Sequence, residues 1–185
     1  MNTHQAMDDL KAIREIMART RRESSGGGGW FMILWGMVWV VGFSGSQFLL
    51  PQQAGWLWLC LNVPGIIITG VLLYRMGKRS HVKSPVSRLI VFWWLTLIIF
   101  DVALVFLFNL KTDRDIMLLA VLSIAMGYVQ FGLFSHWLIT VIGVIMAAVA
   151  LGTTWLAPNY FYLMMGMVGG GVLVGSGAWM VRQGE

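Results

Sequence analysis

The chain has 185 residues, of which 58% are hydrophobic and only 11% are charged, and its mean hydropathy is +0.75. Because soluble domains carry about 25% charged residues, this composition excludes an ordinary soluble domain and indicates a membrane protein. The formal net charge of +5 does not indicate nucleic-acid binding, since the basic residues lie at the ends of apolar runs and form no face of their own.

The first predicted element precedes every apolar run and consists of residues 3–23. Its apolar residues recur at helical spacing, with acidic residues near the start and arginines near the end; the apolar positions are Ala6, Leu10, Ile13 and Met17. We expect residues 1–25 to form a cytoplasmic amphipathic helix that lies on the anionic leaflet or pairs with a partner protein or a second copy. The glycines of residues 26–29 lack the Gly-Lys-Ser/Thr ending of a phosphate loop, so we interpret them as a linker.

This helix contains the sequence IREIMAR, residues 13–19, shortly before the first apolar run. In this respect the chain loosely resembles a group of small bacterial polytopic membrane proteins that begin with a short polar helix. The resemblance covers a small part of the chain. It implies a bacterial inner membrane and nothing about activity.

Six apolar runs follow the linker. A hydrocarbon core about 30 Å thick needs about 20 apolar residues per helix, and backbone groups in lipid must all be paired within the protein. The runs are Trp30–Leu50, Trp56–Tyr74, Arg88–Phe108, Ile116–Phe134, Trp137–Leu156 and Tyr160–Val181. The sequence therefore predicts an all-α integral membrane domain of six transmembrane helices over residues 30–185.

Lysines and arginines are concentrated in alternate connections. They occur before the first run, between the second and third runs, and after the last run, whereas Lys111 and Arg114 on the other side are offset by Asp113 and Asp115. The positive-inside rule then places both termini in the cytoplasm. We expect a bacterial inner (cytoplasmic) membrane protein whose surroundings are the lipid bilayer.

The first and last hairpins show a weak internal similarity. Aligning Gly36 with Gly143 also pairs Pro51 with Pro158, Gly70 with Gly177, and Arg75 with Arg182. A parallel repeat of hairpins 1–2 and 5–6 is one interpretation. The other is that two helical hairpins of the same topology share such punctuation.

The last run is rich in glycine. Gly166/Gly170 and Gly171/Gly175 are GxxxG pairs on different faces of the predicted helix. Small residues let two helices approach closely in lipid, so we expect both pairs to be helix-packing sites. Either both faces pack within the bundle, or one of them contacts another subunit in a homo-oligomer.

Asp101 is the one carboxylate within an otherwise apolar run. At 1.5 Å per residue it lies about 10 Å below the outer end of its predicted helix. Counting from the same side, Ser123, Asn62 and Ser44 occupy nearly the same level on three other helices. A carboxylate at this depth must be paired, hydrated or protonated, and intramembrane acids are often functional.

Two functional classes remain open, of which we expect the first and keep the second as the alternative. In the first, Asp101, Asn62, Ser123 and Ser44 form the polar or proton site of a small transporter or channel. In the second, the protein is a non-transporting accessory, sensory or assembly protein that acts through helix and partner contacts. We expect no enzyme activity, cofactor or metal site, because the sequence offers no nucleophile–base pair, no catalytic pair of carboxylates and no metal-ligand spacing.

Overall fold

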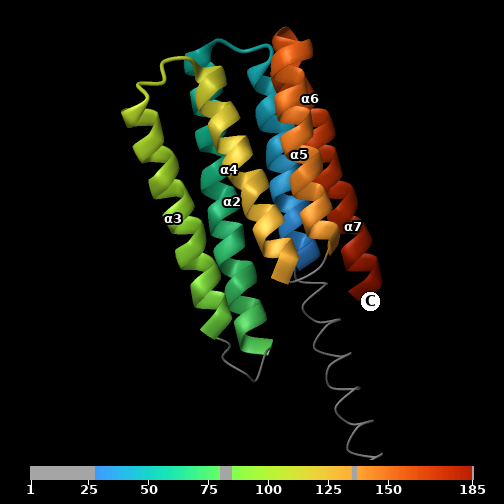
Figure 1. Ribbon diagram of the computed structural model, residues 1–185. Helices are drawn as coiled ribbons and strands as arrows, with labels where there is room; N and C mark the ends of the chain where they lie inside the picture. The colour runs from blue at the N-terminus through green and yellow to red at the C-terminus, as the bar shows by residue number, and fades with distance from the viewer. Residues whose placement is uncertain (1–27, 80–84, 135–136, 185) are drawn as a thin grey trace, which may run out of the picture.

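The computed structural model describes residues 28–79, 85–134 and 137–184 (Figure 1). These residues are almost entirely helical and contain no strand. The predicted amphipathic helix of residues 1–25 lies outside the described residues. Gly28 and Gly29, which we predicted to be linker, instead belong to the first helix.

The described helices follow the predicted runs with shifted ends. They are the first helix (Gly28–Ser46), α2 (Pro51–Arg79), α3 (Pro85–Leu107), α4 (Asp113–Phe134), α5 (Trp137–Leu156), and a last rod made of the 3-10 turn η1 (Pro158–Tyr160), α6 (Phe161–Met164), the π-helix η2 (Met165–Gly170) and α7 (Gly171–Gly184). Five of the described segments are long and apolar enough to cross a membrane. The predicted run Arg88–Phe108 is not among them, because the described apolar stretch of α3, Phe92–Leu107, is shorter.

Local chemistry explains where the helices begin and end. Pro51 and Pro85 open α2 and α3, because proline at the first helical position loses no hydrogen bond. The Gln53 side chain accepts a hydrogen bond from the Leu50 N–H at 3.3 Å, which is half of a capping box. At the other end of α3, Asn109 adopts the left-handed conformation with φ 49°, and the Leu110 N–H bonds back to the Val105 carbonyl, as in a Schellman cap.

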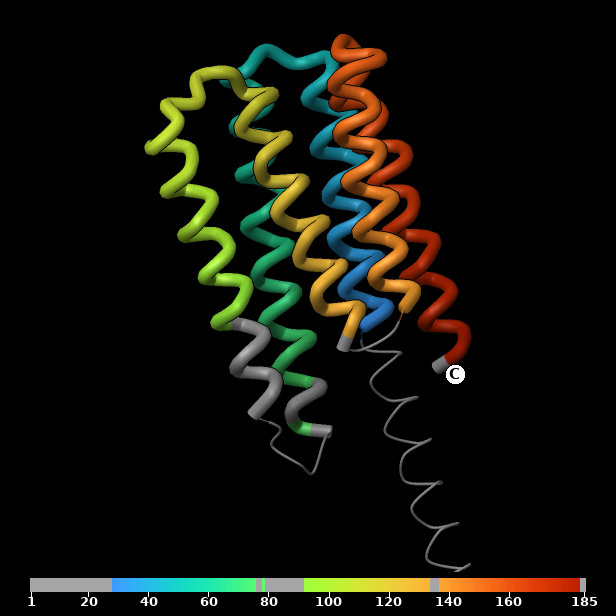
Figure 2. The backbone as a smooth tube through the Cα atoms, in the orientation of Figure 1, coloured from blue at the N-terminus to red at the C-terminus, as the bar shows by residue number. Residues whose placement is uncertain are grey.

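The densest packing involves the first helix, α4, α5 and the last rod. These four supply the buried hydrophobic side chains of the described core: Met32, Val38, Trp39, Phe43, Val121, Ala125, Ile142, Met146, Ala150, Phe161, Met165 and Leu173. By contrast only 6% of the span in α2 is buried. Figure 2 shows α3 at one edge of the bundle and α7 at the opposite edge. The molecule therefore has a firm core, with α2 and α3 more loosely attached to it.

Two pairs of helices approach each other at backbone distance through glycine. A Cβ built on Gly36 would lie 2.9 Å from the Gly170 carbonyl oxygen, so the first helix and the last rod touch directly. A Cβ built on Gly143 would lie 2.5 Å from the Ala125 carbonyl oxygen, which joins α5 to α4 in the same way. Real Cβ atoms do not come this close, so these positions require glycine.

The glycines matched by the predicted repeat have different surroundings. Gly36 and Gly143 both press against a neighbouring helix, but Gly177 contacts Gly29 whereas nothing lies near a Cβ at Gly70. The repeat stays a prediction: Gly36 and Gly143 have similar surroundings, whereas Gly70 and Gly177 do not.

Candidate functional site

Asp101 on α3 is joined to Ser123 on α4. The Ser123 hydroxyl donates a hydrogen bond to Asp101 Oδ1 over 2.5 Å, and both side chains are half-buried. Counting residues from the helix ends placed these two at the same level, and the structure brings them together. A serine hydroxyl has one proton to donate, so it satisfies one of the two carboxyl oxygens.

Aromatic side chains of α3 also pack against α4. Trp93 and Trp94 form this aromatic seam with Gly127 and Tyr128. Trp93 covers Gly127 of α4, where an added Cβ would meet the indole at 2.6 Å. One residue on, the rings of Trp94 and Tyr128 meet edge to face with centroids 6.4 Å apart. The opposite side of α3 is open: Ile99 is 68% exposed and Phe92 is 65% exposed. The helix is thus attached by one face only.

A shallow groove of about 320 Å³ adjoins the Asp101–Ser123 pair. Its lining comes from α3 and α4 and consists of Asp101, Val102, Val105, Phe106, Ile116, Leu119 and Ala120. Asp101 is the single polar side chain in that lining. The groove wall is therefore apolar, with one carboxyl-bearing residue among its lining residues, which suits an apolar partner better than a hydrated ion.

Ser44 and Asn62 do not join Asp101. Ser44 lies at the contact between the first helix and η2, where its hydroxyl is 2.6 Å from the position of a Cβ on Gly166. That hydroxyl is buried and has no hydrogen-bond partner among the described residues. Asn62 is half-buried on α2, and in the described part of the chain its side chain forms no hydrogen bond with Asp101, Ser123 or Ser44. The four polar residues therefore occupy three separate places.

Other polar contacts between helices were not anticipated from the sequence. The Trp58 indole N–H donates to Ser46 Oγ at 3.0 Å, and the Trp35 indole N–H donates to Thr69 Oγ1 at 3.2 Å. Both bonds fasten α2 to the first helix. The available signal was the tryptophan itself, because a buried indole N–H requires an acceptor; its partner is not apparent from spacing alone.

Gln47 performs the same task near the connection between the first helix and α2. Its side-chain Nε2 donates to the backbone carbonyl oxygen of Asn159 at 2.9 Å. Its side-chain Oε1 accepts a hydrogen bond from the Leu163 N–H at 3.2 Å. Residues far apart in the chain are joined by these bonds, which tie the first helix to the start of the last rod. One of the four unpaired N–H groups at that helix start is satisfied in this way.

The two predicted glycine pairs have different surroundings. Gly166 and Gly170 are buried against the first helix, where a Cβ on Gly170 would lie 2.8 Å from the Val40 backbone nitrogen. Gly171 and Gly175 are exposed, and nothing lies within 4 Å of a Cβ built on either one. The first pair thus packs inside the bundle, and the second faces outward.

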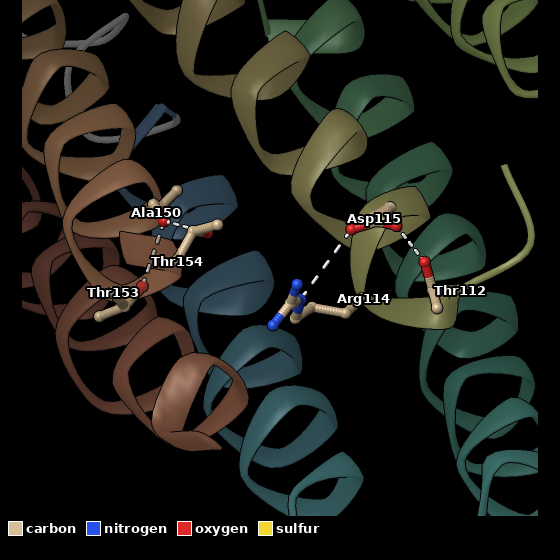
Figure 3. Close-up of polar contacts among 6 residues, drawn as sticks. All are labelled: Thr112, Arg114, Asp115, Ala150, Thr153 and Thr154. Atoms are coloured by element: carbon tan, nitrogen blue, oxygen red, sulfur yellow. Dashed lines mark hydrogen bonds and ion pairs between the residues drawn. The ribbon is translucent and has the colours of Figure 1, made fainter. Parts of the chain in front are cut away.

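Polar groups also form local contacts at the start of α4 and near the end of α5 (Figure 3). Asp115 lies between two partners: it accepts a hydrogen bond from the Thr112 hydroxyl, and its Oδ1 is 3.9 Å from Arg114 Nε. On α5 the hydroxyls of Thr153 and Thr154 donate to the Ala150 carbonyl oxygen of their own helix. These contacts are local, since each joins residues no more than four positions apart.

No protein-family model, curated protein or solved structure matches this chain. Within the described ranges, moreover, no three histidine, cysteine or acidic side chains gather as metal ligands do. The Asp101–Ser123 pair joins an ionisable side chain of α3 to α4 and is the candidate functional contact of the described residues.

The strength of that pair is open to direct measurement. In a double-mutant cycle of Asp101→Ala and Ser123→Ala, we expect a coupling free energy below about 2 kcal/mol, the usual range for hydrogen bonds between membrane helices. Unfolding of the detergent-solubilised protein by increasing sodium dodecyl sulfate measures it. Asp101→Asn retains an acceptor oxygen and should lose less stability than Asp101→Ala, whereas strictly additive single effects would contradict the bond.

Proposed function

We propose that this chain is a bacterial inner-membrane protein with six transmembrane helices and both termini in the cytoplasm. We further propose that it is an accessory, sensory or assembly protein that acts by binding other membrane proteins and does not move a solute. The predicted N-terminal amphipathic helix and the exposed α3 would be its two contact elements.

The arrangement of the helices supports the topology. The 23-residue α3 is long enough to span, given a rise of 1.5 Å per residue, and runs alongside the other helices (Figure 1). Gly29 near the start of the first helix touches Gly177 in α7, so the first helix begins at the end of the bundle where α7 finishes (Figure 1). The end of α2, with Arg75 and Lys78, lies at that end too, and the positive-inside rule assigns such basic ends to the cytoplasm.

One observation carries the functional proposal: the predicted polar side chains are distributed over separate helix contacts and do not converge on a cavity. Asp101 is hydrogen-bonded to Ser123, and Ser44 is enclosed by the first helix and η2. A solute-binding site needs several polar groups around one water-filled cavity. A proton pathway needs a series of ionisable groups. A carboxyl group at the edge of the bundle fits helix–helix recognition better.

The exposure of α3 indicates where a partner would bind. The helix is held by the aromatic seam and the Asp101–Ser123 bond, while several of its large apolar side chains, such as Ile99, Phe100 and Phe106, are exposed. Because lipid and apolar side chains are equally apolar, specific helix association in a membrane depends on shape and on a few polar groups. Asp101, the one polar residue that lines the apolar groove, provides such a group.

Photo-crosslinking in native membranes tests this role. Benzoylphenylalanine in place of Phe106, which lines the groove, should yield one defined protein adduct, and Asp101→Ala should weaken it several-fold. The same probe at Leu156, also exposed but on α5, is the matched control and should yield no such adduct. A Phe106 pattern identical to that of the control, or unaffected by Asp101→Ala, would refute the proposed contact.

A proton- or cation-binding transporter is the second candidate, and the groove beside the half-exposed Asp101 is the observation that favours it. The full chain reconstituted in liposomes under an imposed pH or cation gradient distinguishes the two proposals. We expect no protein-dependent flux. A flux that disappears in Asp101→Asn, with that variant still folded, would establish the transporter and overturn the accessory role.

A further inference from the structure

The end of α2 bears an exposed group of phosphate-binding side chains. Tyr74, Arg75 and Lys78 are all exposed, and the Lys78 ammonium lies 5.2 Å from the centroid of the Tyr74 ring. Residues three and four positions apart on a helix are neighbours on one face, so the phenol, the guanidinium and the ammonium share a surface. The cation–π contact holds the flexible lysine in place there.

This surface is strongly basic and unneutralised. Five basic residues and no acidic residue occur between positions 75 and 88: Arg75, Lys78, Arg79, Lys83 and Arg88. Within the described residues, neither Arg75 nor Lys78 forms an ion pair with a carboxylate. The surface therefore offers free charge to an anion, and Arg75 presents the planar fork that suits phosphate oxygens.

An apolar strip continues from the basic group along the same face of α2. Ile67 and Val71 are 61% and 46% exposed, and they precede Tyr74 and Lys78 at helical spacing. Between them lies Gly70, where an added Cβ would meet nothing within 4 Å. The face thus passes from a charged end to an apolar surface with a shallow notch at the glycine.

We propose that this face of α2 binds an anionic phospholipid, with the phosphate held by Arg75 and Lys78 and an acyl chain lying along Ile67 and Val71 over Gly70. The position is appropriate, because the apolar span Pro51–Arg75 ends at Arg75, which is where a headgroup begins. A free anion would use the basic group alone, whereas a phospholipid uses both parts of the face. This inference goes beyond the proposed function and does not depend on it.

Native mass spectrometry of the full chain in detergent, titrated with phosphatidylglycerol, tests the charged part. The wild type should retain this lipid in preference to phosphatidylcholine with the same acyl chains. Arg75→Gln with Lys78→Gln should bind it about 30-fold more weakly, since each basic residue near a headgroup contributes about 1 kcal/mol. The charge-matched control, Lys111→Gln with Arg182→Gln, also changes exposed residues and should bind as the wild type does.

A second pair of variants tests the acyl-chain strip. Gly70→Leu fills the notch and should reduce retention of phosphatidylglycerol several-fold, whereas Gly55→Leu on the same helix, where a Cβ is equally unobstructed, should not. Circular dichroism checks that all variants are folded. Equal retention of the two lipids by the wild type, or an equal loss in the Lys111/Arg182 control, would overturn the site by showing that binding is not specific or reflects net charge alone.

Discussion

Replacing Gly170 with alanine is expected to destabilise the protein severely, while the same change at the adjacent Gly171 is expected to be harmless. A methyl group on Gly170 would lie 2.8 Å from the Val40 nitrogen and 2.9 Å from the Gly36 carbonyl oxygen. These are backbone atoms of the first helix, so they cannot move aside as the end of a flexible side chain does. Overpacking of this kind costs about 1–3 kcal/mol.

Gly171 provides a control that differs by one position. Nothing lies within 4 Å of its added Cβ, and alanine favours a helix by up to about 1 kcal/mol relative to glycine. The free energy of unfolding in sodium dodecyl sulfate titrations should therefore fall for Gly170→Ala and stay the same or rise for Gly171→Ala. Equal effects would show that the first helix does not touch the last rod at this point.

The second large effect is expected at Gly143, where α5 meets α4. An added Cβ there would lie 2.5 Å from the Ala125 carbonyl oxygen and 2.8 Å from the Val129 nitrogen. Both are again backbone atoms, and α4 and α5 form one of the two glycine-mediated contacts of the core. Gly143→Ala should lower the free energy of unfolding by about 1–3 kcal/mol, and Gly143→Leu should prevent accumulation of folded protein.

The matched control for this prediction is in the same helix. Gly152→Ala adds a methyl group where nothing lies within 4 Å, so it should be neutral or slightly stabilising. Thermal unfolding of the detergent-solubilised variants, followed by tryptophan fluorescence, measures both. A destabilisation at Gly152 as large as that at Gly143 would mean that helix flexibility, and not close packing, makes glycine necessary in α5.

These glycine contacts explain how a firm core coexists with loosely attached helices. The first helix, α4, α5 and the last rod interlock at backbone distance, and their side chains form the described core. In contrast, α2 and α3 are attached through tryptophan contacts and single hydrogen bonds. The proposed partner site on α3 and the proposed lipid site on α2 are therefore on the two helices with most free surface, where binding disturbs the core least.

The pattern of apolar residues is enough to predict a helical, apolar chain and the positions of most of its helices. The predicted run Trp137–Leu156 coincides with α5, and the proline at the start of α2 was visible as a break between runs. The prediction works because a helix in lipid must satisfy its backbone hydrogen bonds within itself. The hydropathy along the chain is therefore sufficient to locate each helix. Counting residues likewise placed Asp101 and Ser123 at one level.

Which residues at the same depth contact one another depends on how the helices pack. Ser44 and Asn62 were counted to the same depth as Asp101, yet Ser44 lies against Gly166 and forms no hydrogen bond with Asp101 among the described residues. Similarly, Gly166/Gly170 and Gly171/Gly175 are the same motif in sequence, but one pair is buried and the other exposed. Hydropathy measures position along a helix axis, whereas rotation about that axis and the choice of neighbour depend on side-chain packing between helices, which no single segment encodes.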